Sequence, residues 1–204
     1  AGLICKKFTT KHYSRPSGQM SLQTYFENNN LVGISDVDTR ALVRHIRSKG
    51  AMNAIISSEE LNVEVLKQKL SLVPSMEGLE LSSKVSTKAP YYFGNNDARY
   101  KVAVLDLGVK RSILSCLAER DCYLKVFPMN ASLETMQLWE PDGFMLSNGP
   151  GDPAAMPEVV ETIKNILNTD YPVFGICLGH QVLSRAVGLS TYKMHNGHRG
   201  INHP

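Results

Sequence analysis

Residues 173–181 read VFGICLGHQ, an apolar run in which Cys177 stands between two glycines. The residues before Cys177 are typical of a buried strand, and the segment HQVLSRAV after it is typical of a helix. Gly175 and Gly179 complete the pattern Gly-x-nucleophile-x-Gly, in which a sharp strand-to-helix turn lifts the central side chain out of the sheet. Such a turn leaves no room for flanking side chains, which explains the glycines. The stretch therefore predicts an exposed thiol at a helix N-terminus, where the helix dipole favours the thiolate.

The sequence before this turn alternates between short apolar runs and segments of helical length. The expected strands are KVAVLDLG at 101–108, CYLKVF at 122–127, GFMLSNG at 143–149 and PVFGIC at 172–177. The expected helices between them are KRSILSCLAERD at 110–121, LETMQLW at 133–139 and PEVVETIKNILN at 157–168. Because the strands are apolar on both faces, we expect an α/β fold with a mostly parallel, doubly wound sheet. Ligands of such sheets bind at the carboxyl ends of the strands, after Leu105, Leu146 and Ile176.

A second unusual loop, SNGPGDP at 147–153, follows one of these strands. Gly149 and Gly151 allow the backbone to come close to a ligand, while the prolines restrict the shape of the loop before any ligand arrives. The N–H of Leu178, which follows the nucleophile, is the natural donor to a developing oxyanion. The residues alone therefore point to Cys177, Leu178 and the glycine loop as a candidate site.

The first half of the chain has a different pattern. VGISDVDTRALVRHIRSKG at 32–50 predicts a short strand and then a helix that Asp36 or Asp38 caps and Gly50 ends. AMNAIIS at 51–57 is typical of a strand, and Ser57 with Glu60 forms a possible capping box for a helix over 59–70. Loose, polar sequence from residue 74 to 100 predicts a linker with a domain boundary near residue 98. We thus expect part of a smaller α/β domain over residues 1–97 and the doubly wound domain over 98–204.

Composition excludes several classes of function. The net charge of +3 is spread along the chain without a basic tract, so nothing indicates nucleic acid or a membrane surface as a partner. No apolar run approaches the roughly 18 residues of a membrane span. Cys5, Cys116, Cys122 and Cys177 show no C-x-x-C pair, which favours reduced thiols and a cytoplasmic protein. Of these, Cys116 and Cys122 are expected to be small buried core thiols.

With LSNGPGDP at 146–153 and FGICLGHQ at 174–181, the chain resembles the class I (triad) glutamine amidotransferases. Three further segments resemble the small subunit of glutamine-dependent carbamoyl phosphate synthetase: DVDTRALVRHIRSKGA at 36–51, VLDLGVKRSIL at 104–114 and KMHNGHRGINHP at 193–204. The first of them belongs to that subunit's own N-terminal domain. The resemblance extends over nearly the whole chain.

This resemblance implies that Cys177 attacks the glutamine amide to form a γ-glutamyl thioester. It also implies that Leu178 and Gly151 donate backbone N–H groups to the oxyanion, and that Gly149, Gly151, Leu178 and Gln181 help to bind glutamine. The ammonia would pass to a large synthetase subunit that uses ATP and Mg²⁺ for arginine or pyrimidine biosynthesis, whereas the small subunit needs no cofactor or metal.

A Cys nucleophile needs a base, normally a His oriented by a third group. The resemblance places the family's His and Glu after Pro204, and a glutamine-contacting Ser before Ala1. We therefore expect the chain to be a piece of a longer protein that cannot by itself turn over glutamine at a useful rate. His180 is expected to brace the turn rather than act as base. His195, His198 and His203 are interpreted as parts of a loop rather than a zinc site.

Three alternatives stay open at this point. A different triad amidotransferase is disfavoured by the segment at 36–51. A redox-sensing or regulatory protein could use the same strand-Cys-helix turn, and would form a sulfenic acid at Cys177 without recognising glutamine. An adaptor could dock on a larger enzyme through the basic helix face of Arg40, Arg44 and Arg47, a role that does not exclude the first function.

Overall fold

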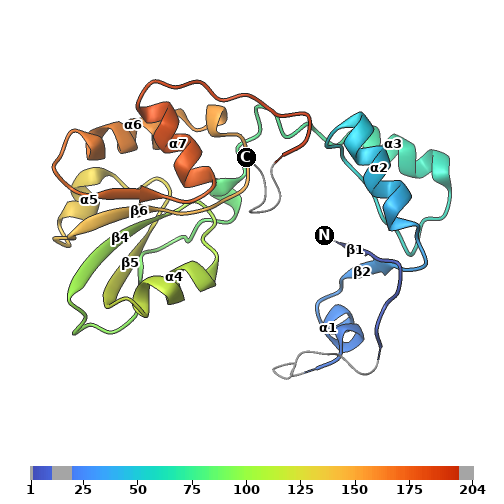
Figure 1. Ribbon diagram of the computed structural model, residues 1–204, viewed down its shortest axis with the longest axis horizontal. Helices are drawn as coiled ribbons and strands as arrows, with labels where there is room; N and C mark the ends of the chain where they lie inside the picture. Colours follow the sequence, from blue (N-terminus) through green and yellow to red (C-terminus); the bar gives the residue numbers. More distant parts are fainter. Residues whose placement is uncertain (1, 11–19, 198–204) are drawn as a thin grey trace. The chain divides into compact units, whose positions relative to one another are not determined.

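The computed structural model describes residues 2–10 and 20–197 (Figure 1). By their contacts these residues form two compact units. The first unit runs to Pro74 and includes residues 193–197, and the second comprises residues 75–192. The division therefore lies between Pro74 and Ser75 rather than near residue 98. Residues 75–97, expected as a linker, belong to the second unit because they hydrogen-bond to loops at the edge of its sheet.

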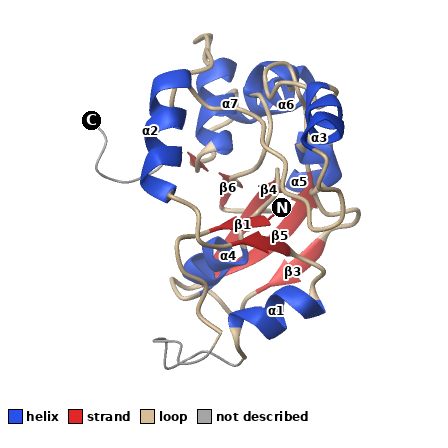
Figure 2. Cartoon of the chain, turned by 90° about the vertical axis from the view of Figure 1, so that its right-hand side faces the viewer, coloured by secondary structure: helices blue, strands red, loops and turns tan. Residues whose placement is uncertain are grey.

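The second unit is built on a five-stranded sheet with the order β3-β5-β4-β6-β7. Figure 2 labels the strands β3, β4, β5 and β6 of this sheet. All neighbouring strands are parallel except β3, which runs antiparallel to β5 along one edge. The strands are β3 (Tyr91–Phe93), β4 (Tyr100–Asp106), β5 (Cys122–Pro128), β6 (Gly143–Leu146) and β7 (Val173–Gly175). The expected mostly parallel sheet is thus confirmed, and the short antiparallel strand β3 is the strand of this sheet that was not expected from the sequence. Because β5 and β6 lie on opposite sides of β4, the chain changes direction there and leaves a ligand-binding edge at the carboxyl ends.

Helices cover both faces of this sheet, as expected for a doubly wound fold (Figure 1). On one face, α4 (Arg111–Ala118) packs through Leu114 against the apolar side chains of β4 and β5. On the other face lie α5 (Leu133–Gln137), α6 (Pro157–Leu167) and α7 (Leu178–Ala186). These helices coincide with the expected segments because their apolar positions recur at helical spacing.

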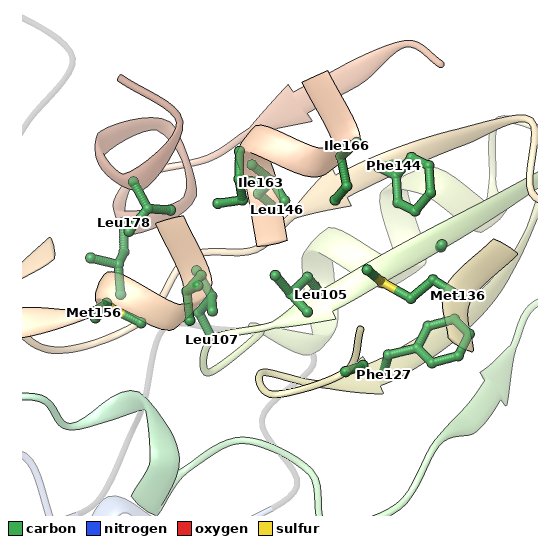
Figure 3. Packing of buried hydrophobic residues seen from close by; sticks show 14 residues of the cluster. Leu105, Leu107, Phe127, Met136, Phe144, Leu146, Met156, Ile163, Ile166 and Leu178 are labelled. Carbon is green, nitrogen blue, oxygen red and sulfur yellow. The ribbon is translucent and has the colours of Figure 1, made fainter. Parts of the chain in front are cut away.

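The larger core cluster lies between β4, β6 and the helices α5, α6 and α7. Leu105, Leu146 and Ile163 are fully or almost fully buried in it (Figure 3). Leu178, the first residue of α7, also points into this cluster and is 1% exposed. The residue that follows the candidate nucleophile therefore anchors the start of its helix in the core.

The first unit contains a two-stranded parallel sheet, in which β1 (Gly2–Ile4) pairs with β2 (Val32–Ile34). Its helices are α1 (Leu22–Asn28), α2 (Thr39–Lys49) and α3 (Val63–Ser71). Among the described residues, every fully buried apolar side chain lies in the second unit. The sequence-based boundaries are accordingly less accurate in the first unit, where tertiary packing does less to select between local conformations.

Helix α2 was predicted correctly, and the cap is Asp38, whose carboxylate accepts hydrogen bonds from the N–H groups of Arg40 and Ala41. Gly50 ends this helix with a φ of 89°, as its position predicts. Two other expectations were wrong. Residues 51–57 form no strand, and α3 begins at Val63 with Asn62 as its cap, because Ser57 instead closes a separate turn through the N–H groups of Glu59 and Glu60.

Within the part of the chain that the structure describes, no helix combines the length and the apolar character needed to cross a membrane.

Candidate active site

Cys177 lies at the turn between β7 and α7, with its side chain exposed. Its backbone has φ 54° and ψ −112°, a region that a residue with a side chain rarely adopts. Such strain persists where the surroundings fix it. Here the N–H of Ile176 donates to the Leu146 carbonyl, and the N–H of Gly179 donates to the Ser147 carbonyl, both at 3.0 Å. Bonds on both sides of Cys177 thus tie the turn to the end of β6.

The two glycines of the turn are required by close contacts. A Cβ atom on Gly175 would lie 2.7 Å from the carbonyl carbon of Gly179 and 2.8 Å from the amide nitrogen of His180. A Cβ atom on Gly179 would lie 2.6 Å from the carbonyl carbon of Leu146. These partners are backbone atoms that cannot rotate away. The collision expected from the sequence is therefore confirmed at both positions.

The start of α7 gives Cys177 a set of amide donors. Cys177 is the N-cap residue, and its thiol makes no capping hydrogen bond. The first N–H groups of a helix have no partner within the helix. Among the described residues, the Leu178 N–H has no acceptor, whereas the next N–H, of Gly179, is taken by Ser147. The Leu178 N–H is thus free to donate to an acceptor beside the sulfur, and its role as oxyanion donor stays a prediction.

The glycine loop follows β6, the strand next to β7 in the sheet. A Cβ atom on Gly149 would lie 2.7 Å from the carbonyl carbon of Leu107, so this position also excludes a side chain. Gly151 has a φ of 110°, which favours glycine for conformational reasons. The glycine loop and the Cys177 turn thus leave the sheet from adjacent strands at its carboxyl edge.

Two polar side chains join the glycine loop to the loop after β4. The Ser147 hydroxyl is completely buried, accepts the Leu107 N–H at 2.9 Å and donates to the Asn148 carbonyl at 2.8 Å. The Asn148 side chain accepts the Lys110 N–H at 2.9 Å and donates to the Gly108 carbonyl at 3.1 Å. Neither Ser147 nor Asn148 was among the predicted site residues, although a Ser-Asn pair directly after a buried strand could have indicated this role.

Asp152 fixes the far end of the glycine loop. One carboxylate oxygen accepts the Gly78 N–H, and the other accepts the Ala154 N–H, each at 2.8 Å. These two bonds stabilise the charged form and lower the pKa of Asp152 below its ordinary value of 3.8, with a smaller contribution from the positive charge of Arg185. Because the folded pKa lies below the unfolded one, the stability that this carboxylate contributes is present above pH 3.8 and is lost as the pH falls through the folded pKa.

Replacing Asp152 should therefore matter at neutral pH and not in acid. We expect Asp152→Asn to lower the free energy of unfolding at pH 7 by about 1 kcal/mol, since one of two charge-assisted bonds is weakened or lost. The difference from wild type should shrink steadily as the pH is lowered past 3.8. Urea unfolding at a series of pH values measures it, with the exposed Asp170→Asn as the matched control. A deficit that stays constant from pH 7 to pH 3 would contradict this assignment.

The structure brings together four of the five site residues that the sequence and the resemblance indicate. Gly149 and Gly151 lie on the loop after β6, and Cys177 and Leu178 lie at the end of β7. Gln181 is one turn further along α7, exposed, and its N–H donates to the Cys177 carbonyl at 3.0 Å. It is therefore on the correct helix. Its contact with glutamine stays a prediction.

The other cysteines provide a useful comparison. Cys122 is buried, as expected, and burial raises the pKa of its thiol, with a further increase from the carboxylate of Asp121. Cys116 was expected to be buried but is exposed on α4. The reason is its position on the helix, two residues after Leu114 and therefore about 200° around the helix from the side that packs on the sheet. Exposure alone therefore does not distinguish Cys177 from Cys116, whereas the strained backbone and the free amide do.

In the described part of the chain, no histidine ring is hydrogen-bonded to Cys177. His180 is exposed, and its ring makes no hydrogen bond to a described residue, so bracing by hydrogen bonding is not observed, while bracing by packing stays a prediction. The ring of His195 lies 3.3 Å from the Arg47 carbonyl, and the His195 carbonyl accepts the Ala51 N–H at 2.9 Å. These contacts agree with a structural loop role for His195. His198 and His203 lie outside the described residues.

A second surface feature is the basic face of α2 in the first unit. Arg40, Arg44 and Arg47 line an open hollow together with Thr39 and Val43. None of the three guanidinium groups forms an ion pair with a described carboxylate. The face is thus available to an acidic partner, but it holds no nucleophile or other group for catalysis.

Comparison with known proteins agrees with this geometry. Residues 103–204 match the family model "Glutamine amidotransferase class-I", and residues 1–56 match the CPSase domain of the carbamoyl-phosphate synthase small chain. The carbamoyl phosphate synthase small chain of Synechococcus is 43% identical over 100% of this chain and 55% of the relative. The proteins of the same name from Pyropia yezoensis and Chlorobaculum tepidum are each 41% identical, over 100% and 94% of this chain and 56% and 53% of the relative.

The chain spans about half the length of the curated relatives that it matches. The two family models match in the same order as the two units of the structure, with the amidotransferase match covering half of the chain. The Cys177 turn and the glycine loop both lie inside that match. The chain therefore belongs to the class-I glutamine amidotransferase family, and its similarity to carbamoyl phosphate synthase small chains extends through both of its units.

Proposed function

We propose that the protein containing this chain is the glutamine-hydrolysing small chain of carbamoyl phosphate synthase, a subunit of a ligase complex. The observation that carries the proposal is the exposed Cys177 in strained backbone at the N-terminus of α7, beside the free Leu178 N–H and next to the glycine loop. A redox sensor would need the exposed thiol, but it would not need a preformed loop above it.

In the proposed reaction, the Cys177 sulfur attacks the side-chain amide carbon of glutamine and forms a C–S bond, while the carbonyl oxygen becomes an oxyanion. The N–H groups of Leu178 and Gly151 bind this oxyanion, and Gly149 and Gln181 help to hold the substrate. The C–N bond then breaks, and the nitrogen leaves as ammonia after it receives a proton. Water hydrolyses the remaining γ-glutamyl thioester to glutamate. A His oriented by a Glu, as the family resemblance implies, would move these protons.

The ammonia would be used by a large synthetase subunit, which would bind ATP and Mg²⁺ in arginine or pyrimidine biosynthesis. The small chain itself would need no cofactor. The basic face of Arg40, Arg44 and Arg47 is one candidate contact with that subunit, since three guanidinium groups that form no ion pair with a described carboxylate suit an acidic surface. We also propose a cytoplasmic location, because all four cysteines are free.

Labelling with a glutamine-derived electrophile tests this function directly. We expect 6-diazo-5-oxo-L-norleucine to modify Cys177 in the complete protein, and excess glutamine to protect it. Iodoacetamide serves as the comparison, because it should also alkylate the exposed Cys116, and glutamine should not protect that residue. Mass mapping identifies the modified residue. Label on Cys5 or Cys116 in place of Cys177, or label that glutamine fails to reduce, would contradict the proposal.

A further inference from the structure

A segment that precedes the sheet in sequence lies along the glycine loop in space. We call residues 78–87 the strap. Glu80 pairs with Gly151 in an isolated antiparallel bridge, and the Asp152 N–H donates to the Leu79 carbonyl at 2.9 Å. The Gly78 N–H donates to the Asp152 carboxylate in the same region. The strap and the glycine loop are therefore joined by one backbone bridge and by the hydrogen bonds beside it, although about 70 residues separate them in sequence.

Ser82 makes the central side-chain contact of the strap. Its hydroxyl donates to the Pro150 carbonyl at 3.0 Å, and the residue is completely buried. Pro150 lies between the two glycines that the proposed function assigns to glutamine and to the oxyanion. A buried hydroxyl without a partner is costly, so burial fixes both the rotamer of Ser82 and the position of the carbonyl that it bonds. The Ser82 hydrogen bond thus fixes how far the glycine loop lies from the sheet.

The far end of the strap is tied to the two other loops at the same edge. The Thr87 N–H donates at 2.8 Å to Asp106, a buried carboxylate at the end of β4. The Ser86 hydroxyl accepts the Met129 N–H, just after β5, at 2.9 Å. The strap therefore spans the loops after β4, β5 and β6. The bonds to the loops after β4 and β5 anchor the strap, and this anchoring allows it to hold the glycine loop.

The register of the bridge determines which way Gly151 faces. In two antiparallel strands, directly opposite residues alternate between two kinds of pair. In the first kind the two residues hydrogen-bond to each other through both N–H groups, and in the second kind they form no hydrogen bond to each other. The bond from Asp152 to Leu79 flanks the Glu80–Gly151 pair, which makes this a pair of the second kind. The strap therefore uses the backbone on either side of Gly151 and leaves the Gly151 N–H itself for another acceptor. That N–H is one of the two donors proposed for the oxyanion.

We propose that the strap holds the glycine loop in the position needed for oxyanion binding, and that Ser82 is its main positioning residue. The inference rests on the proposed function of Cys177 as the nucleophile for glutamine. An oxyanion donor acts over a narrow range of about 2.7–3.1 Å, and a displacement of about 1 Å can lower the rate roughly 100-fold. A segment that fixes the loop therefore affects catalysis without touching the substrate.

Ser82→Ala in the complete protein tests this proposal. We expect kcat for glutamine hydrolysis to fall about 10-fold or more with KM within about 3-fold, because the oxyanion forms only in the transition state. Alkylation of Cys177 by iodoacetamide forms no oxyanion, so its rate should stay within about 2-fold of wild type. The control is Ser184→Ala, which removes the same kind of bond, from a hydroxyl to the His180 carbonyl at 2.9 Å, away from the loop. It should leave both rates unchanged.

The outcomes separate the two proposals. A wild-type protein that hydrolyses glutamine, with a Ser82→Ala variant equally fast, would overturn the role of the strap and leave the proposed function intact. A wild-type protein that does not hydrolyse glutamine would overturn both. Parallel loss of hydrolysis and alkylation in Ser82→Ala would show general disruption and contradict a positioning role. If Ser82→Ala does not fold, Asp152→Asn, which weakens the other anchor of the glycine loop, must show the same separation of the two rates.

Discussion

Cys177→Ser should lower the rate of glutamine hydrolysis by the complete protein at least about 10⁴-fold, because loss of the nucleophile removes the covalent pathway. A hydroxyl at this position is a far weaker nucleophile than a thiolate, and the free Leu178 N–H can only stabilise an oxyanion that forms. Steady-state assay of glutamate and ammonia measures the loss. Cys116→Ser, which changes an exposed thiol on α4, should leave the rate within about 2-fold of wild type, since it contacts no part of the site.

The same substitution should leave the fold intact. The Cys177 side chain is exposed and makes no hydrogen bond to a described residue, and a Ser keeps its size and its backbone requirements. We therefore expect the urea midpoint of Cys177→Ser to match wild type, with a change in unfolding free energy within about 0.5 kcal/mol. Residual glutamine hydrolysis above about 1% of wild type would exclude Cys177 as the nucleophile, because a triad nucleophile contributes far more.

The Cys177 turn could be predicted from sequence because all of its requirements are local. The apolar strand, the two glycines and the helix lie within about fifteen residues, and each restricts the same backbone conformation. The close contacts of Gly175 and Gly179 with backbone atoms explain why this pattern is specific. The alternation of strands and helices in the second unit was predictable for a similar reason, since one buried core selects the periodic patterns around it.

The strap could not be predicted because its contacts are distant in sequence. Residues 78–87 have no helical or strand periodicity, and their polar groups bond to loops that begin about 20 to 70 residues later. The loose composition that suggested a linker is in fact the composition of a segment whose backbone is satisfied by other loops. Strand β3, three residues long, has too few positions for an alternating pattern.

In the first unit, the error at residues 51–57 has another cause. The apolar pattern of AMNAIIS fits a strand, but a strand needs a neighbour with free backbone groups. The Asn53 side chain instead donates to the carbonyls of Val73 and Pro74, each at 3.1 Å, and so connects this segment to the end of α3. An apolar pattern indicates that one side of a segment is buried, but it does not show that a neighbouring strand is available to pair with the segment.

Gly179→Ala should be among the most damaging of the conservative changes in the second unit. The added Cβ would lie 2.6 Å from the Leu146 carbonyl carbon and 2.7 Å from the Ser147 carbonyl oxygen, both at the rigid end of β6. Relief requires α7 to move outward, which lengthens the Gly179 N–H bond to Ser147 and carries Cys177 and the Leu178 N–H away from the glycine loop. We expect a loss of about 3 kcal/mol or more in unfolding free energy, as for severe overpacking, and roughly 100-fold slower glutamine hydrolysis where the variant folds.

Gly188→Ala provides the matched control for this change. Gly188 lies just beyond α7 with a φ of 92° and no atom within 4 Å of an added Cβ, so Ala there meets only the conformational cost of that backbone, about 1 kcal/mol. Gly179, in contrast, has a backbone conformation that alanine also adopts, so the whole cost of Gly179→Ala comes from the collision. Urea unfolding of both variants, together with their rates of glutamine hydrolysis, separates the two effects. If Gly179→Ala proves no less stable than Gly188→Ala, then β6 and α7 are not packed closely enough to force the strained conformation of Cys177.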